Sequence, residues 1–248
     1  MVKRDVTGRY RGSMLGILWS FFLPVFMLGV YTFVFSVVFK ARWQAGSDSK
    51  TEFALVLFAG LLVFNLFAEC VTKAPGLILS NANYVKKVVF PLEILPVVAL
   101  GAALFHMLVS LVVWAVFYLA LFGKVPSTAI ALPLVLLPLI LLSLGLSWFL
   151  AAIGVYLRDI AQITGVVVST LMFLSPIFFP LSALPESYQP LLLLNPLTPA
   201  IEMSREVLVW GHWPNWALLG QYLLLASLIA YLGFAWFQKT RKGFADVL

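Results

Sequence analysis

The chain has little charge and almost no cysteine. Of its 248 residues, 10% are charged and 62% are hydrophobic, whereas a soluble globular chain carries about a quarter charged residues. This composition excludes a water-soluble domain and indicates a membrane protein. The single cysteine, Cys70, excludes an internal disulfide and any multi-cysteine metal site, and its apolar neighbours favour a packing role.

The sequence also lacks the short motifs of common catalytic and nucleotide-binding sites. No GxxxxGK[ST] occurs, so the chain is expected to bind no ATP in a P-loop of its own. HExxH, GxSxG and CxxC are missing too. His106 lies in an apolar run with no acid, cysteine or second histidine at ligand spacing, which favours a hydrogen-bonded packing role over catalysis. We therefore predict no catalytic residue, no metal site and no cofactor bound by this chain.

Long apolar runs are what the sequence does have. A bilayer core of about 30 Å needs roughly 20 apolar residues per crossing. Six runs meet that length approximately: 18–39, 53–71, 94–122, 129–156, 163–180 and 216–237. The sequence therefore predicts one all-α transmembrane domain, 1–248, with six membrane-spanning helices.

Basic residues are distributed unevenly over the connections between these runs. With six spans both termini lie on one side, and that side carries eleven of the 16 Lys and Arg residues while the other side carries five. The positive-inside rule then predicts that both termini are cytoplasmic. The net charge of +6 is accordingly read as a signal of orientation, and no nucleic acid is expected as a partner.

Two connections are longer than simple turns. The cytoplasmic segment 73–91 is too short and too polar to cross the membrane, and its centre can form a short surface helix that docks a partner; a solvated loop is about equally favoured. In the outer segment 181–215, Thr198 as N-cap, Pro199 at the first helical position and Gly211 past the end predict a short half-embedded helix.

Few charged residues fall inside the predicted spans. Glu69 and Glu93 lie near span ends, where they can pair with nearby basic residues, Lys73 among them. No chain of buried carboxylates is present in the sequence, which argues against an ion-coupled carrier. Small residues such as Gly145 and Gly154 offer close-packing surfaces, either within one subunit or between two.

The first span carries a row of aromatic side chains at helical spacing. Packing or lipid contact is favoured for such a row by about two to one over a wall that stacks on sugar rings. The row consists of Trp19, Phe22, Phe26 and Phe33.

Five segments, in order along the six spans, resemble the membrane subunit of type-2 ABC exporters, specifically the branch that exports O-antigen, capsular polysaccharide or teichoic acid. The resemblance covers essentially the whole chain. The resemblance rests on these segments: RYRGSMLGILW at 9–19, NYVKKVVFPLEILP at 83–96, YLRDI at 156–160, LNPLTP at 194–199 and FADV at 244–247.

This resemblance implies a homodimer in the bacterial cytoplasmic (inner) membrane, with two separate ABC subunits that hold ATP and Mg on its cytoplasmic face. Segment 1–17 looks like an interface helix, although family members usually carry a longer stretch before the Arg-Tyr motif than the one before Arg9 here. Either the interface helix is short or the chain begins too late. Residues that look like the coupling helix are Asn81, Asn83, Tyr84, Lys86 and Lys87.

The function implied by the resemblance is export of a polyprenyl-pyrophosphate-linked glycan through a channel lined by the aromatic row. A basic cytoplasmic rim would attract the pyrophosphate, unless these residues only orient the chain. An exporter of a drug or lipid with the same architecture is the alternative, and an intramembrane enzyme is disfavoured. The rim would be Arg9, Tyr10, Arg11 and Arg158, and the outer gate Asn195, Pro196, Thr198, Glu202 and Arg205.

Overall fold

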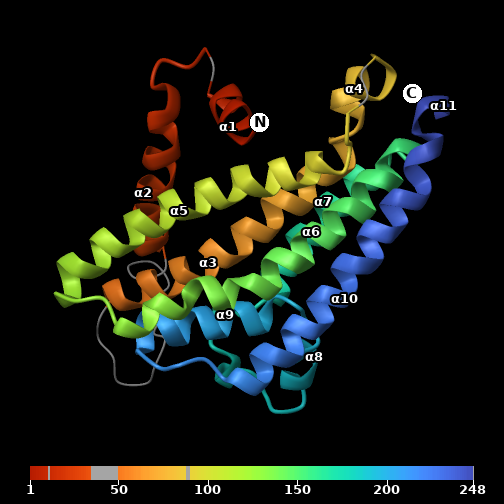
Figure 1. Ribbon diagram of the computed structural model, residues 1–248. Coiled ribbons are helices and arrows are strands. Elements are labelled where there is room, and N and C mark those ends of the chain that lie inside the picture. Colours follow the sequence, from red (N-terminus) through yellow and green to blue (C-terminus); the bar gives the residue numbers. More distant parts are fainter. Residues whose placement is uncertain (11, 35–49, 88–89, 248) are drawn as a thin grey trace.

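The computed structural model describes residues 1–10, 12–34, 50–87 and 90–247, and all of its regular elements in these ranges are helices (Figure 1). This confirms the all-α prediction. Within the described ranges, five helical stretches are long and apolar enough to cross a membrane: Gly16–Val34, Thr51–Gly76, Ile94–Phe122, Ser127–Tyr156 and Trp216–Val247.

Helix α3 (Lys50–Lys73) lies at the centre of the bundle. It packs against α5 (Ile94–Phe122), α6 (Leu132–Tyr156) and α9 (Thr198–Arg205). Within its apolar window 83% of residues are buried, compared with 11% in the stretch that contains α2 (Trp19–Tyr31). Side chains therefore hold α3 on all sides, whereas α2 touches the rest of the described chain along one narrow face.

Small residues bring α6 close to α10 (Trp216–Thr240). A Cβ atom added at Gly145 would lie 2.6 Å from the Cα of Ala230, so only glycine fits there, and Gly233 lies directly against Gly145. Gly154 faces the backbone of Pro75 in the 3₁₀ turn η3 (Ala74–Gly76) just as closely. These small residues are thus used for packing inside one chain.

Both termini lie at the same end of the molecule, which we call the terminal end. Figure 1 shows α1 (Val2–Arg9), α4 (Ala82–Lys87) and α11 (Phe244–Val247) there, and α8 (Gln189–Leu193) and α9 at the opposite end. A small apolar cluster of its own, which includes Ile78, Phe237 and Phe244, anchors the terminal end.

The fifth predicted span, 163–180, is the helix α7 (Ile160–Leu174), which has 15 residues. The helix starts three residues before the predicted span. It ends sooner than predicted because Ser175 precedes a proline and takes an extended conformation. At about 1.5 Å per residue it covers roughly 22 Å, less than a bilayer core. It nevertheless returns the chain from the terminal end, where α6 ends, to the opposite end. The six-span count remains a prediction.

The first predicted span, 18–39, is described as far as Val34; the rest lies outside the described residues. It begins with the 3₁₀ turn η1 (Gly16–Leu18) and continues as α2. Between α1 and α2 the chain turns, with Gly12 at φ of 87° and Gly16 at φ of 52°, values that glycine adopts without strain. This turn places α1 against α5 instead of in line with α2.

Candidate functional site

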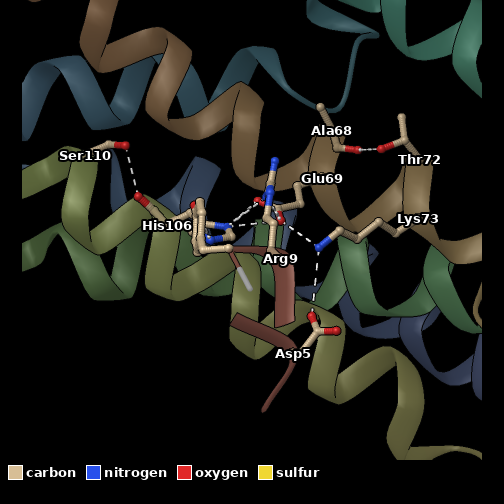
Figure 2. Close-up of polar contacts among 9 residues, drawn as sticks. Asp5, Arg9, Ala68, Glu69, Thr72, Lys73, His106 and Ser110 are labelled. Carbon is tan, nitrogen blue, oxygen red and sulfur yellow. Dashed lines mark hydrogen bonds and ion pairs between the residues drawn. The ribbon is translucent and has the colours of Figure 1, made fainter. Parts of the chain in front are cut away.

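The centre of the candidate site is the carboxylate of Glu69, near the terminal end of α3 (Figure 2). It accepts a hydrogen bond of 2.8 Å from the Nη1 of Arg9 on α1 and one of 2.8 Å from the Nζ of Lys73. The Nδ1 of His106 on α5 lies 3.0 Å from its other oxygen. Glu69 therefore joins three helices at one point.

The spacing of residues along α3 places the Glu69 carboxylate beside Lys73. Glu69 and Lys73 are separated by four residues, which puts both side chains on one face of α3. Lys73 also lies 3.9 Å from Asp5 of α1, so the last turn of α3 holds the N-terminal helix by a second contact. The Glu69 side chain is 17% exposed and that of His106 is 16% exposed, while Arg9 is 50% exposed.

The imidazole of His106 links Glu69 to Tyr10. Since a carboxylate only accepts hydrogen bonds, the short contact to Glu69 favours the proton on Nδ1. The Nε2 atom is then free to accept from the hydroxyl of Tyr10, 3.3 Å away, and the two rings meet edge to face at 6.1 Å. Burial raises the pKa of Tyr10, so its hydroxyl stays protonated and can donate.

The cluster forms the polar end of a cavity of 460 Å³ between α2, α3 and α5. Arg9, Tyr10 and Lys73 line that end, and mainly apolar side chains of α2, α3 and α5 line the remainder, with Asn65 and Ser110 among them. A second cavity, of 480 Å³, lies beneath α1 and shares Arg9 and Lys73 as wall residues. The cluster thus separates two spaces, one among the spans and one at the terminal surface.

Of the predicted rim, the structure brings two residues into this cluster, Arg9 and Tyr10. Arg158 is exposed in the turn between α6 and α7 and lines neither cavity. Arg11 lies outside the described residues. The hydrogen-bonded role predicted for His106 and the pairing of Glu69 with Lys73 both hold, but the contact between Glu69 and His106 was missed.

The predicted coupling segment contains a helix, α4, at the terminal end. Tyr84 accepts a hydrogen bond of 2.8 Å from the Arg4 guanidinium and stacks on Phe90 at 4.8 Å. Asn81 donates to the carbonyl of Leu77, and Asn83 is exposed. Lys86 and Lys87 belong to α4, but their side chains lie outside the described part. Tyr84 therefore connects α1 to α4.

The predicted aromatic row lies on the face of α2 that points away from the cavity. Trp19 and Phe22 meet edge to face at 5.5 Å, and Phe22 and Phe26 stack at 6.3 Å. Phe26 is 56% exposed and Phe33 is 60% exposed. Trp19 is half-buried, and the three phenylalanines are exposed in the described part of the chain.

At the opposite end, the predicted gate residues form a buried cluster around Arg205. This side chain is 1% exposed. It donates to the carbonyls of Val56 on α3 at 3.1 Å and Ile177 at 2.9 Å, to that of Pro176, and to the carboxylate of Glu202 at 2.9 Å. One guanidinium thereby fixes α9 to α3 and to the segment after α7.

Asn195 and Thr198 tie the start of α9 to the same place. The amide of Asn195 donates to the carbonyl of Leu174 and its oxygen accepts from the backbone of Leu197. Thr198 donates to the carbonyl of Leu192 at 2.6 Å. The predicted N-cap was wrong by one residue, because Leu197 is the N-cap and the Thr198 hydroxyl bonds backwards to α8.

Pro196 lies between these two anchors, next to the turn that Asn195 makes. After Arg205, the helix continues as a π-helical turn, Glu206–Trp210. It ends at Gly211 with φ of 72°, where the sequence predicted its end. The gate segment is thus a helical unit bonded to the bundle at both its start and its middle.

Comparison with known proteins gives a family and similar curated proteins. The profile of a family described as ABC-2 type transporter matches residues 1–209. Two proteins of Klebsiella pneumoniae, each named O-antigen export system permease protein RfbA, are 24% identical over 250 residues, covering 100% of this chain and 93% of theirs. A Myxococcus xanthus protein of the same name is 30% identical over 132 residues, 53% of this chain and 48% of its own length.

Proposed function

This chain belongs to the family of ABC-2 type transporters, and from that membership we propose that it is the channel-forming subunit of an ATP-driven exporter of a lipid-linked polysaccharide. Two copies form the channel, and two separate subunits hydrolyse ATP. The proposed substrate class is supported by the similarity to O-antigen export permeases over the full length of this chain.

The proposed topology places the terminal end in the cytoplasm. Its support is the excess of basic residues in the connections assigned to that side, together with the position of both termini at one end of the helices (Figure 1). An odd number of crossings would separate the termini. The proposal therefore includes α7 as a sixth, short crossing, with the bilayer thinned or the segment after Leu174 completing it.

A single-thiol experiment tests this topology. Cys70 is the one cysteine of the sequence and is 1% exposed, so a new cysteine in an exposed position can be labelled selectively. Asn83→Cys should react with a membrane-impermeant maleimide only after the cytoplasmic side is opened. Tyr188→Cys, whose parent side chain is 59% exposed at the opposite end, should react from outside. The reverse pattern would invert the orientation.

The proposed contact with the ATP-hydrolysing subunit is α4, together with α1, which Arg4 connects to it. The decisive experiment co-expresses this chain with the genes beside its own and asks whether a P-loop subunit co-purifies in equal amount with ATPase activity. A stable complex of two and two supports the proposal. Purification of the chain alone, without any ATPase subunit, would contradict the proposal.

The coupling contact has its own test within that complex. A photo-crosslinking residue at Asn83, which is exposed on α4, should trap the ATPase subunit. The same residue at Leu224, which is 74% exposed on α10, serves as the matched control and should not. Equal crosslinking at both positions would contradict the assignment of α4.

Substrate binding is proposed at the rim and along the aromatic row. Exchange of Arg9 and Arg11 for Gln should abolish glycan export while the complex still assembles. Removal of the ring at Trp19 or Phe26 should slow export if the row stacks on sugars. Flux of a fluorescent drug or lipid in place of glycan would instead favour the alternative exporter of the same architecture.

A further inference from the structure

The cavity between α2, α3 and α5 is charged at one end, and the rest of its wall is mainly apolar, with the polar side chains of Asn65 and Ser110 among the lining residues. At the apolar part, Leu23 and Met27 of α2 face Phe58 and Leu62 of α3. All four lie on stretches long and apolar enough to cross a membrane. A cavity of 460 Å³ falls in the range of about 300–1,000 Å³ that small-molecule sites occupy.

The polar end has hydrogen-bond donors to spare. Arg9 uses Nη1 for Glu69, which leaves its other N–H groups, and the Arg9 side chain is 50% exposed. Lys73 carries three N–H bonds and is 36% exposed. Two acids lie at this end, Glu69 within hydrogen-bond distance of both cations and Asp5 at 3.9 Å from Lys73.

The second cavity adds charge on the other side of the same pair. Arg4 lines it together with Arg9 and Lys73. Counted over both cavities, these three cations face the two acids Asp5 and Glu69, with His106 beside Glu69. The combined space therefore has a positive balance at the depth where the spans meet the terminal surface, which suits a phosphate group.

The length of the whole cavity, from its polar end to its apolar end, matches one leaflet. The α2 wall extends from Ser20 to Tyr31 and the α3 wall from Phe58 to Glu69, about 16 Å each at 1.5 Å per residue. Half of a hydrocarbon core of about 30 Å is about 15 Å. A single acyl chain of one leaflet has this length, whereas a polyprenyl carrier chain is much longer.

We propose that this cavity binds an anionic glycerophospholipid, with one acyl chain between α2 and α3 and the phosphate at Arg9 and Lys73. This site shares Arg9 with the rim of the proposed function, whereas its apolar wall on α2 does not include the aromatic row. The lipid completes the packing of α2, whose stretch is 11% buried in the chain. It would thereby fix how α2 sits against the bundle, and α2 carries the aromatic row on its other face.

Native mass spectrometry of the purified full-length chain, with any subunits that co-purify, tests the proposal. The probes are phosphatidylglycerol, phosphatidylcholine with the same acyl chains, and undecaprenyl phosphate, added at equal concentration. We expect phosphatidylglycerol to be retained at one molecule per chain, at least fivefold over phosphatidylcholine. Lys73→Gln should reduce that preference to twofold or less.

Filling the cavity supplies the matched variants. Asn65 lines the cavity and is exposed, so Asn65→Trp occupies the space without displacing a packed side chain. Met27→Trp does the same from the α2 wall. Both should lower phosphatidylglycerol retention at least fivefold, and Leu224→Trp, on an exposed part of α10, should leave it unchanged. Equal retention in all three variants would overturn the proposal.

A photo-crosslinking residue at Asn65 identifies the occupant in cells, without reliance on how the Trp variants fold. A glycerophospholipid adduct supports the proposal. A polyprenyl adduct, or undecaprenyl phosphate displacing phosphatidylglycerol in the mass spectra, would assign the cavity to the lipid carrier and overturn it. A crosslink between two copies of this chain would show that a second subunit covers the cavity, and would overturn it as well.

Discussion

The two ends of the molecule each contain an ion pair that joins helices, but they are built differently. Arg205 is 1% exposed and donates mainly to backbone carbonyls. Glu69 is 17% exposed, lines a cavity, and accepts from the long side chains of Arg9 and Lys73. Carbonyls move only when their helix moves, whereas long side chains change rotamer. The end with Arg205 is therefore fixed, and the terminal end is adjustable.

The largest effect is expected at Arg205. Arg205→Met removes the cation and leaves the Glu202 carboxylate and the carbonyls of Val56 and Ile177 without their donor. The Glu202 side chain is 37% exposed and can turn to water, so the loss comes mainly from the buried carbonyls, of which each unsatisfied one costs about 1–3 kcal/mol. We expect a loss of this size in the free energy of unfolding, measured by denaturation in detergent. A variant as stable as the wild type would contradict the conclusion that Arg205 fixes this end of the molecule.

Gly60 offers a second way to disturb the same cluster without touching a polar group. A Cβ atom at Gly60 would lie 2.6 Å from the Nη2 of Arg205, so Gly60→Ala must displace the guanidinium. Overpacking of this kind costs about 1–3 kcal/mol.

Gly220 on α10 is the matched control for Gly60, since a Cβ atom there meets no atom within 4 Å. Gly220→Ala should stabilise α10 by about 0.5–1 kcal/mol. The two glycine variants should thus shift the unfolding midpoint in opposite directions. Shifts of the same sign would mean that Arg205 gives way easily.

This contrast marks how far the sequence could predict the molecule. Hydropathy found the long helices because apolar length is a local property, and Gly211 marked the end of the gate helix for the same reason. The contact between Glu69 and His106 joins positions 37 residues apart on different helices. A local sequence pattern cannot predict such a contact.

Arg205 was assigned to the outer gate, but its burial was not foreseen. Its partners are largely backbone carbonyl groups, which each residue possesses. The residue types in the sequence therefore do not indicate which groups Arg205 contacts. The length of α7 was overestimated because apolar residues continue past Ser175 and Pro176, where the backbone leaves the helix.

A smaller loss of stability is expected at the adjustable end. Glu69→Gln keeps the shape of the side chain but removes its charge, and Arg9 and Lys73 remain partly exposed to water. We expect about 1 kcal/mol in the free energy of unfolding, the usual net value of a hydrogen bond. Protease cleavage of α1 should increase more than global unfolding does, because α1 loses a main attachment. Equal changes in both would argue against local loosening.

The smallest effect on stability is expected at Tyr84. The Arg4–Tyr84 bond is exposed, so Tyr84→Phe should alter the free energy of unfolding by less than about 0.5 kcal/mol. If α4 transmits motion to α1 through this bond, the variant should still hydrolyse ATP in complex with its partner but export less glycan per ATP. Tyr231→Phe, at a position 69% exposed on α10, is the control and should keep the wild-type ratio. An unchanged ratio in Tyr84→Phe would show that the adjustable end moves without this bond, and would leave the Glu69 cluster as the link between α1 and the spans.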